Sequence, residues 1–141
     1  MTDAAPTFPL LVVAAALADP DGNMLLQQRP VGKNHGGLWE FPGGKVEHDE
    51  TPEAALVREL AEELGIVVDP VALQPATFSS IGAADRPLIL LLYRVTAWQG
   101  RPEPLEATGL AWVAPSDMAH WPMPPADYPL AEHLVRLSGQ A

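Results

Sequence analysis

Apolar residues along the chain occur in short uninterrupted runs, a pattern that is typical of buried strands. The first run covers residues 8–18, and the turn-forming residues 19–23 separate it from a second, shorter run at 24–26, which opens a returning strand predicted over 24–29. Because Asp, Pro, Gly and Asn favour tight turns, these two runs predict a β-hairpin. Further strands are predicted at 67–68, 76–81, 88–98 and 110–113.

Residues 52–64 instead show apolar residues at helical spacing, with signals at both ends. Thr51 offers a hydroxyl cap, Pro52 suits the first helical position, and Gly65 is a natural stop. The predicted inward face consists of Leu56, Val57, Leu60, Ala61 and Leu64. The predicted opposite face carries Glu59, Glu62 and Glu63. A second, shorter helix is predicted at about 129–138.

Strands that surround two helices predict a layered α/β (α+β) fold with a mixed β-sheet. The chain has 141 residues and shows no repeat, linker or compositional break, so a single domain over 1–141 is expected. The longest apolar runs are too short to span a bilayer, and no basic residue precedes the first of them. We therefore expect a cytoplasmic protein that does not bind membranes.

Composition excludes several kinds of site. The chain contains no Cys, which rules out disulfides, a thiolate zinc site and a Cys nucleophile. Its formal net charge of −10 excludes a nucleic acid polymer as a sequence-independent partner. Eight of its eighteen acidic residues lie in the segment 40–63, so the acidity is concentrated in one part of the chain.

A set of Gly, Arg, Glu and apolar residues at a defined spacing lies in that segment and just after it, between residues 44 and 66. In order, the set is Gly44, Glu50, Arg58, Glu59, Leu60, Glu62, Glu63, Gly65 and Ile66. Glu59, Glu62 and Glu63 are three and four positions apart, and like charges at that spacing destabilise a bare helix. A cation would offset their repulsion, and ligands that are all oxygens favour Mg²⁺ or Mn²⁺ over zinc.

Other residues of the segment suit such a site. Arg58 can orient a neighbouring carboxylate through a bidentate pair, and Gly43 and Gly44 allow the backbone to approach a metal or a phosphate closely. Taken alone, a Glu-x-x-Glu-Glu run is more often a solvated acidic helix face than a metal site. The spacing of the whole set is what favours the metal site.

This set matches the Nudix box at residues 44–66 without a departure, and the chain resembles the Nudix hydrolases. The run from Leu38 to Lys45, the segment from Trp98 to Trp112, and the turn at Pro124 to Ala126 resemble the MutT-like branch of that family. The resemblance implies the Nudix fold, a mixed sheet sandwiched between helices with a loop–helix–loop. It also implies a Mg²⁺-dependent pyrophosphohydrolase that converts a (d)NTP and water to a (d)NMP and diphosphate.

The resemblance further implies roles for single residues. The Gly43 carbonyl, Glu59 and Glu63 would hold the catalytic metal, with Glu62 supporting the cluster and Arg58 beside it. Glu106 matches an acid that binds metal or takes the proton from water. Whether Glu59, Glu63 or Glu106 is the general base stays open, as does the number of metal ions. Glu50 matches a structural position of the motif.

The same comparison implies a nucleotide-binding set. Its members are Arg29, Asn34, Glu40, Phe41, Gly43, Gly44, Lys45, Arg86 and Asp127. His35 would lie in the loop over the nucleotide, Asp85 beside Arg86, and Leu88 in the apolar lining.

Asp127 is the position that bears on the choice of base. The MutT-like pattern has Asn there, whose amide both donates and accepts, whereas an ionised Asp only accepts. The run Pro124 to Asp127 resembles the branch that acts on CTP and modified cytosine nucleotides. The expected substrate is therefore either an oxidised purine nucleotide such as 8-oxo-dGTP or a cytosine nucleotide.

Two alternatives stay open. One is a Nudix hydrolase of a nucleoside diphosphate derivative, such as ADP-ribose or a dinucleoside polyphosphate. The other is a non-catalytic Nudix module that only binds nucleotides. Either a monomer or a homodimer is compatible with the sequence.

Overall fold

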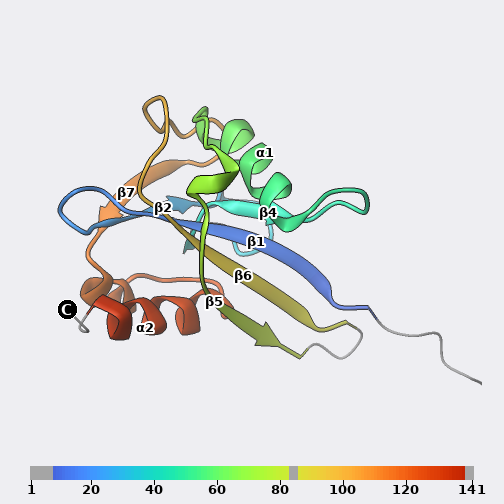
Figure 1. Cartoon of the computed structure of the whole chain (residues 1–141). Coiled ribbons are helices and arrows are strands. Elements are labelled where there is room, and N and C mark those ends of the chain that lie inside the picture. Colours follow the sequence, from blue (N-terminus) through green and yellow to red (C-terminus); the bar gives the residue numbers. More distant parts are fainter. Residues whose placement is uncertain (1–7, 83–85, 139–141) are drawn as a thin grey trace, which may run out of the picture.

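The computed structural model describes residues 8–82 and 86–138 (Figure 1). Its strands are β1 (Leu10–Leu17), β2 (Met24–Gln28), β3 (Trp39–Glu40), β4 (Gly43–Lys45), β5 (Gln74–Ile81), β6 (Leu88–Val95) and β7 (Gly109–Val113). Its helices are α1 (Pro52–Leu64), α2 (Asp127–Ser138) and the short 3₁₀ helices η1 (Pro70–Ala72) and η2 (Pro115–His120).

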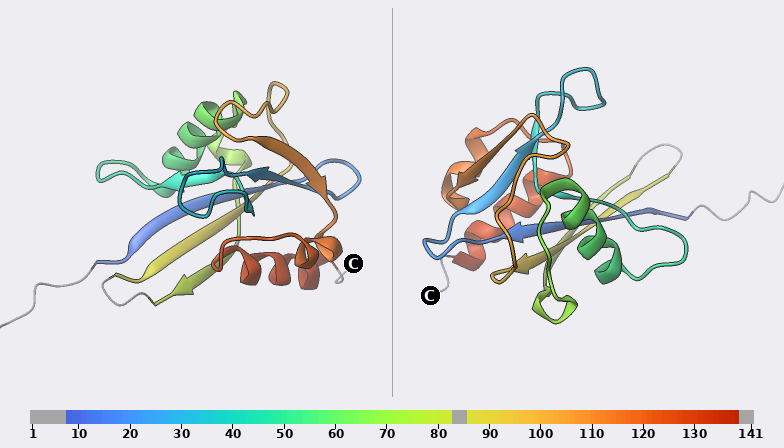
Figure 2. Two further views of the ribbon diagram at one scale, coloured as in Figure 1. Left: turned by 180° about the vertical axis from the view of Figure 1, so that it is seen from behind. Right: turned by 90° about the horizontal axis from the view of Figure 1, so that it is seen from above.

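The strands form two sheets. The larger has the order β4-β1-β6-β5, in which β1 and β6 run parallel while the other neighbours are antiparallel. The smaller is antiparallel, with the order β3-β2-β7. Figure 2 shows the two sheets from behind and from above. The four-stranded sheet is the mixed sheet that the sequence predicts.

Alternate residues of β1 face the two helices, which lie on opposite sides of the mixed sheet (Figure 1). Val13 and Leu17 belong to the core on the α1 side, together with Leu56. Ala14 belongs to the core on the α2 side, together with Leu130. Because both faces of β1 are buried, its sequence is apolar throughout rather than alternating. The layered α/β fold expected from the sequence is thus confirmed.

The predicted hairpin of the first two apolar runs is wrong. Its turn forms, since Asp19 Oδ1 accepts the backbone N–H groups of Asp21 at 3.0 Å and Asn23 at 2.8 Å. Beyond the turn, only one bridge joins the runs, between Ala18 and Met24. The two runs then separate, because β1 is enclosed by β4 and β6 while β2 pairs with β3 and β7.

The helix α1 begins and ends where the sequence predicts. Thr51 Oγ1 accepts the backbone N–H of Ala54 at 3.1 Å, and Gly65 ends the helix in the left-handed conformation with φ 71°. The predicted faces need a correction, because Ala61 is exposed and Glu63 is only 9% exposed. Seven residues nearly complete two helical turns, so Glu63 lies about 20° from the buried Leu56. The buried face of α1 therefore includes Glu63 and does not include Ala61.

Other predicted boundaries differ as well. Val67 forms only an isolated bridge with Gln99, and the strand expected to reach residue 98 ends at Val95. The short strands β3 and β4 were not predicted, because their glycine-rich surroundings indicate loop. No helix within residues 8–82 and 86–138 is long and apolar enough to cross a membrane.

Candidate active site

Two adjacent glycines of β4 allow close contacts with two different elements, the neighbouring strand β1 and the helix α1. A Cβ atom on Gly43 would lie 1.9 Å from the Val13 carbonyl oxygen, which belongs to the neighbouring strand. A Cβ atom on Gly44 would lie 2.4 Å from the Glu59 carboxyl group. At Gly43 the backbone of the neighbouring strand leaves no space for a side chain. At Gly44 the absence of a side chain leaves room for the Glu59 carboxylate.

Glu63 is held at both of its carboxylate oxygens. The backbone N–H of Gly43 donates to Oε2 at 2.9 Å, and the Gln27 side chain donates from Nε2 to Oε1 at 3.1 Å. Burial raises the pKa of Glu63 to about 8, against the opposing effect of the Gln27 hydrogen bond. The negative charges of Glu59, Glu40 and Glu106 raise this pKa further. Glu63 therefore lies where negative charge is in excess.

Arg58 organises the acidic residues at the surface of α1. Its guanidinium forms a bidentate pair with Glu50, with Nη2···Oε1 at 2.5 Å and Nε···Oε2 at 3.1 Å. The same group donates to Glu59 Oε1 at 3.0 Å and to the Lys45 carbonyl at 3.2 Å. Arg58 thus joins the loop after β4 to the helix, and its bidentate partner is Glu50 rather than a member of the Glu59–Glu63 cluster.

Glu62 and Glu106 differ in their position relative to Glu63. Glu62 is exposed, and Arg58 Nη1 lies 3.5 Å from its Oε2. Glu106 lines a small cavity of about 160 Å³ together with Gln27, Glu40 and Glu63. The structure therefore brings Glu106, from the loop before β7, next to Glu63, and leaves Glu62 at the surface.

The donor set suits a divalent cation by its chemistry. Within the described residues, no group of three or more His, Asp or Glu side chains is already arranged around a common point. Glu59 nevertheless lies against Gly44, Glu63 lies against Gly43, and burial raises the pKa of both carboxyl groups above its usual range. Closely spaced carboxylate and backbone oxygens without His or Cys fit a hard cation.

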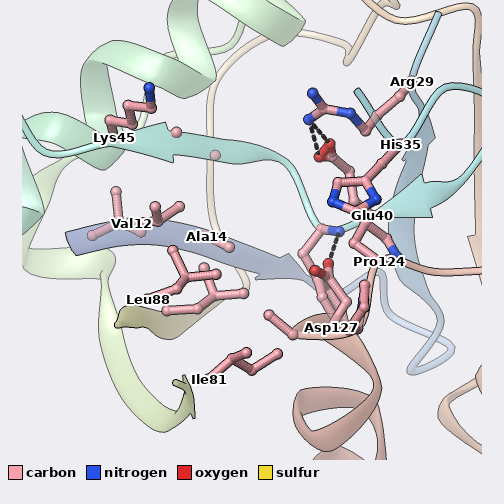
Figure 3. Close-up of a pocket in the computed structure, with 17 residues that line it drawn as sticks. Val12, Ala14, Arg29, His35, Glu40, Lys45, Ile81, Leu88, Pro124 and Asp127 are labelled. Carbon is pink, nitrogen blue, oxygen red and sulfur yellow. Dashed lines mark hydrogen bonds and ion pairs between the residues drawn. The ribbon is translucent and has the colours of Figure 1, made fainter. Parts of the chain in front are cut away.

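A larger cavity of about 400 Å³ adjoins these carboxylates through the same two glycines, which form part of its wall. This volume lies in the range of small-molecule sites. Apolar side chains cover one end of the cavity, namely Val12, Ala14, Ile81, Leu88 and Leu90. Figure 3 shows Arg29, His35, Glu40 and Asp127 grouped at the other end.

Asp127 closes this polar end from the first residue of α2. Its Oδ2 accepts the backbone N–H of Phe41 at 3.1 Å (Figure 3), and its side chain is largely enclosed. Burial raises the pKa of Asp127 to about 7, and the nearby Glu40 adds to the effect. The carboxyl group can therefore change its protonation state near neutral pH.

Arg29 connects the loop at residues 32–37, which contains three glycines, to Glu40. Its Nη1 lies 2.7 Å from Glu40 Oε1, and its Nε donates to the Asn34 carbonyl at 2.7 Å. His35 follows in the left-handed region with φ 59°, an uncommon conformation for a residue with a side chain. The pair thus fixes the loop beside the cavity.

The structure gathers most of the predicted nucleotide-binding residues around the larger cavity. Those that line it are Arg29, Glu40, Phe41, Gly43, Gly44, Lys45 and Asp127. Asn34 is exposed and contributes a backbone carbonyl. Arg86 does not line the cavity, because it is exposed and donates to the Phe8 carbonyl at 2.9 Å. Asp85 lies outside the described residues.

Sequence reasoning missed Gln27. Its amide contacts Glu63 although 36 positions separate the two residues in the chain. The available signal is a polar residue at an inward position of a strand whose first three residues, 24–26, are apolar.

Comparison with known proteins agrees with this geometry. Residues 9–134 match the NUDIX domain. The chain is 40% identical to the CTP pyrophosphohydrolase of Escherichia coli (strain K12), over 91% of this chain and 93% of that protein. It is 42% identical to the 8-oxo-dGTP diphosphatase of Proteus vulgaris, over 64% of this chain and 79% of that protein.

A solved structure shows the same fold. The solution structure of the E. coli ORF135 protein superposes with a TM-score of 0.83 at 38% identity, covering 94% of this chain and 92% of that one. The sequence match, the shared fold and the arrangement of Gly43, Gly44, Arg58, Glu59 and Glu63 lead to one assignment. This chain belongs to the Nudix hydrolase family.

Proposed function

We propose that the protein is a Mg²⁺-dependent nucleoside triphosphate pyrophosphohydrolase that converts a (d)NTP and water to a (d)NMP and diphosphate. The observation that carries this proposal is the shared wall formed by Gly43 and Gly44. On one side of it lies a cavity of about 400 Å³ with a polar end, and on the other lie Glu59 and Glu63. A nucleoside in the cavity would extend its phosphates toward the carboxylates.

Nudix hydrolases generally use divalent metal ions. In this chain, Glu59, Glu63 and the Gly43 carbonyl would hold the ion, with Glu106 as a further oxygen donor and Glu62 supporting the cluster. The bound ion would acidify water and neutralise negative charge on the polyphosphate. We propose Mg²⁺ rather than zinc because the donor set contains only oxygen atoms, and Mn²⁺ is the expected substitute.

The chain's own residues divide the remaining tasks. Arg58 keeps Glu59 in place through the 3.0 Å hydrogen bond, while Glu50 holds Arg58. Lys45 lies on the cavity wall with an exposed side chain, so its ammonium group can pair with a phosphate. A carboxylate next to the reacting water takes its proton, and Glu59, Glu63 and Glu106 are the candidates for this base.

Asp127 and its surroundings indicate which base the cavity accepts. One oxygen of the carboxylate already accepts the Phe41 N–H. When ionised, the carboxylate presents a second acceptor, which suits the exocyclic amino group of cytosine or the N–H groups of 8-oxoguanine. The relatives named CTP pyrophosphohydrolase and 8-oxo-dGTP diphosphatase support these two substrate classes. The proposed role is removal of such nucleotides from the precursor pool.

We further propose that residues 1–141 act as one domain and work in the cytoplasm, where nucleotide precursors are used. The match to the NUDIX domain over residues 9–134 supports the single domain.

An assay with Mg²⁺ that separates the nucleotide products by chromatography and also measures diphosphate tests the proposed function. The panel contains CTP, 5-methyl-dCTP, 8-oxo-dGTP, dGTP, ADP-ribose and a dinucleoside polyphosphate. We expect turnover of the triphosphates with release of diphosphate and a nucleoside monophosphate. Preference for ADP-ribose or the dinucleoside polyphosphate would instead assign a nucleoside diphosphate derivative. Nucleotide binding without turnover of any member would identify a non-catalytic module.

A further inference from the structure

Gln27 is a buried amide within β2, to which the proposed function assigns no role. In register it lies opposite Glu40 of β3 and Leu110 of β7. Its side chain is 5% exposed, and the preceding Leu25 and Leu26 are fully buried. An apolar side chain is the usual occupant of such a position.

The nitrogen and the oxygen of the Gln27 side-chain amide differ in their hydrogen bonding. Nε2 donates to Glu63 Oε1 at 3.1 Å. Oε1 is buried and has no hydrogen-bond partner among the residues that the structure describes. A buried carbonyl oxygen without a donor destabilises the folded state. Packing alone therefore does not explain why this position carries an amide. The side-chain N–H group, which donates to Glu63, is the part of the amide that can have a function.

Glu63 receives its two hydrogen bonds from different sheets. Gly43 lies on β4 of the four-stranded sheet, and Gln27 lies on β2 of the three-stranded sheet. A glutamate side chain has several rotatable bonds, so a single donor leaves its carboxylate free to turn. Donors at both oxygens fix the plane of the carboxylate.

We infer that Gln27 is a positioning residue, whose side-chain N–H and the Gly43 N–H together orient the Glu63 carboxylate for binding a divalent cation. The inference rests on the proposed function, in which Glu63 is a metal ligand. Outer hydrogen bonds to a metal ligand typically contribute 10- to 100-fold in metal affinity or activity. Gln27 thus supports the site through Glu63 and does not itself touch the substrate.

Replacement of Gln27 by Met tests this role, because Met has a similar length and lacks both the donor and the unpartnered oxygen. For Q27M we expect kcat to fall about 10- to 100-fold and the Kd for Mn²⁺, measured by isothermal titration, to rise about 10-fold or more. The KM for the nucleotide stays within about 2-fold, and the Tm changes little, because the stranded Gln27 oxygen is removed while Glu63 Oε1 loses its donor. The matched control is Q74M, which replaces an exposed Gln of β5.

The outcomes separate a positioning role from a structural one. A lower Tm in Q27M with unchanged Mn²⁺ affinity and unchanged kcat overturns the inference. If the wild type turns over no nucleotide, the proposed function fails, and the Mn²⁺ titration alone then decides. Equal affinity in wild type and Q27M, or no Mn²⁺ binding by the wild type, overturns the positioning role.

A measurement on the unmodified protein applies even if Q27M does not fold. Bound Mn²⁺ broadens nearby NMR signals, so substoichiometric Mn²⁺ is expected to broaden the side-chain amide signals of Gln27. Sharp Gln27 signals in a sample that binds Mn²⁺ would contradict the inference.

Discussion

The carboxylate of Asp127 and the backbone N–H of Phe41 lie 86 positions apart in the chain, yet they form a hydrogen bond of 3.1 Å at the end of the larger cavity. This bond ties the start of α2 to the segment between β3 and β4. Because the Phe41 N–H needs an acceptor, it decides how any side chain at position 127 must turn.

The first prediction concerns the choice of base. In Asp127→Asn, the amide oxygen is expected to turn toward the Phe41 N–H, which leaves the amide NH₂ facing the cavity. The cavity then offers a donor where the ionised Asp offers an acceptor. At pH 8 we expect kcat/KM for CTP and 5-methyl-dCTP to fall about 10-fold or more relative to 8-oxo-dGTP, because a carbonyl oxygen of 8-oxoguanine can accept a hydrogen bond from the new NH₂. An unchanged ranking of the substrate panel would show that Asp127 does not read the base.

The second prediction concerns stability as a function of pH. Burial raises the pKa of Asp127 to about 7, compared with about 3.9 for an unfolded Asp. Between these values the folded protein keeps a proton that the unfolded chain has released, so this group's contribution to the unfolding free energy falls as pH rises. In Asp127→Asn this decrease in the unfolding free energy is absent, because Asn does not titrate. Urea unfolding at pH 5 and pH 8 should therefore show that the variant gains stability relative to wild type at the higher pH.

The paired glycines of β4 are expected to respond differently to a methyl group. In Gly43→Ala, the new Cβ meets the Val13 carbonyl and the Ala14 Cα, which are backbone atoms that cannot move aside. We expect destabilisation by about 3 kcal/mol or more, visible as a lower Tm. In Gly44→Ala, the contact is the end of the Glu59 side chain. That variant should fold with a smaller change in Tm and bind Mn²⁺ more weakly.

Arg58 provides a test of geometry at constant charge. In Arg58→Lys, the positive charge remains, but a single ammonium group cannot reproduce the bidentate pair with Glu50 and the contact with Glu59. We expect kcat to fall about 10-fold or more and the Kd for Mn²⁺ to rise. Arg101→Lys, at an exposed position after β6, is the control. Equal kinetic constants in the two variants would show that Arg58 contributes only its positive charge and not its bidentate geometry.

Metal removal and the loss of Glu63 should both stop the reaction while the fold persists. We expect EDTA to abolish diphosphate release and excess Mg²⁺ to restore it. Glu63→Gln should lower kcat by about 100-fold or more, with a Tm close to that of the wild type because Gln has nearly the same size and shape. Steady-state kinetics and thermal unfolding measure both effects. A rate like that of the wild type would show that Glu63 does not hold the metal.

Local signals in the sequence were sufficient for α1 and for the acidic motif. The Thr51 cap, Pro52 and Gly65 act within a few residues of the helix ends, so both ends are predicted correctly. The spacing of the motif identifies the family because it needs no knowledge of tertiary contacts. The helix faces were less predictable, since the position of β4 beside α1 determines that Glu63 is buried.

Features that depend on distant contacts were not predictable in this way. The hairpin prediction fails because the partners of β1 and β2 come from later segments of the chain, as residues 43–45 and 88–95 do for β1. The Gln27–Glu63 hydrogen bond joins β2 of the three-stranded sheet to helix α1 and leaves no periodic pattern in the sequence. The contact between Arg86 and the Phe8 carbonyl was not predictable either, because it depends on the fold.

Glu63 accepts one hydrogen bond from a strand of each sheet, and this arrangement affects how activity is lost as denaturant is added. A small slip between the sheets would part Gln27 from Glu63 before either sheet loses its own hydrogen bonds. Turnover is therefore expected to decline at a lower urea concentration than the circular dichroism signal of the strands. The reaction rate would then serve as an early indicator of inter-sheet loosening, ahead of global unfolding.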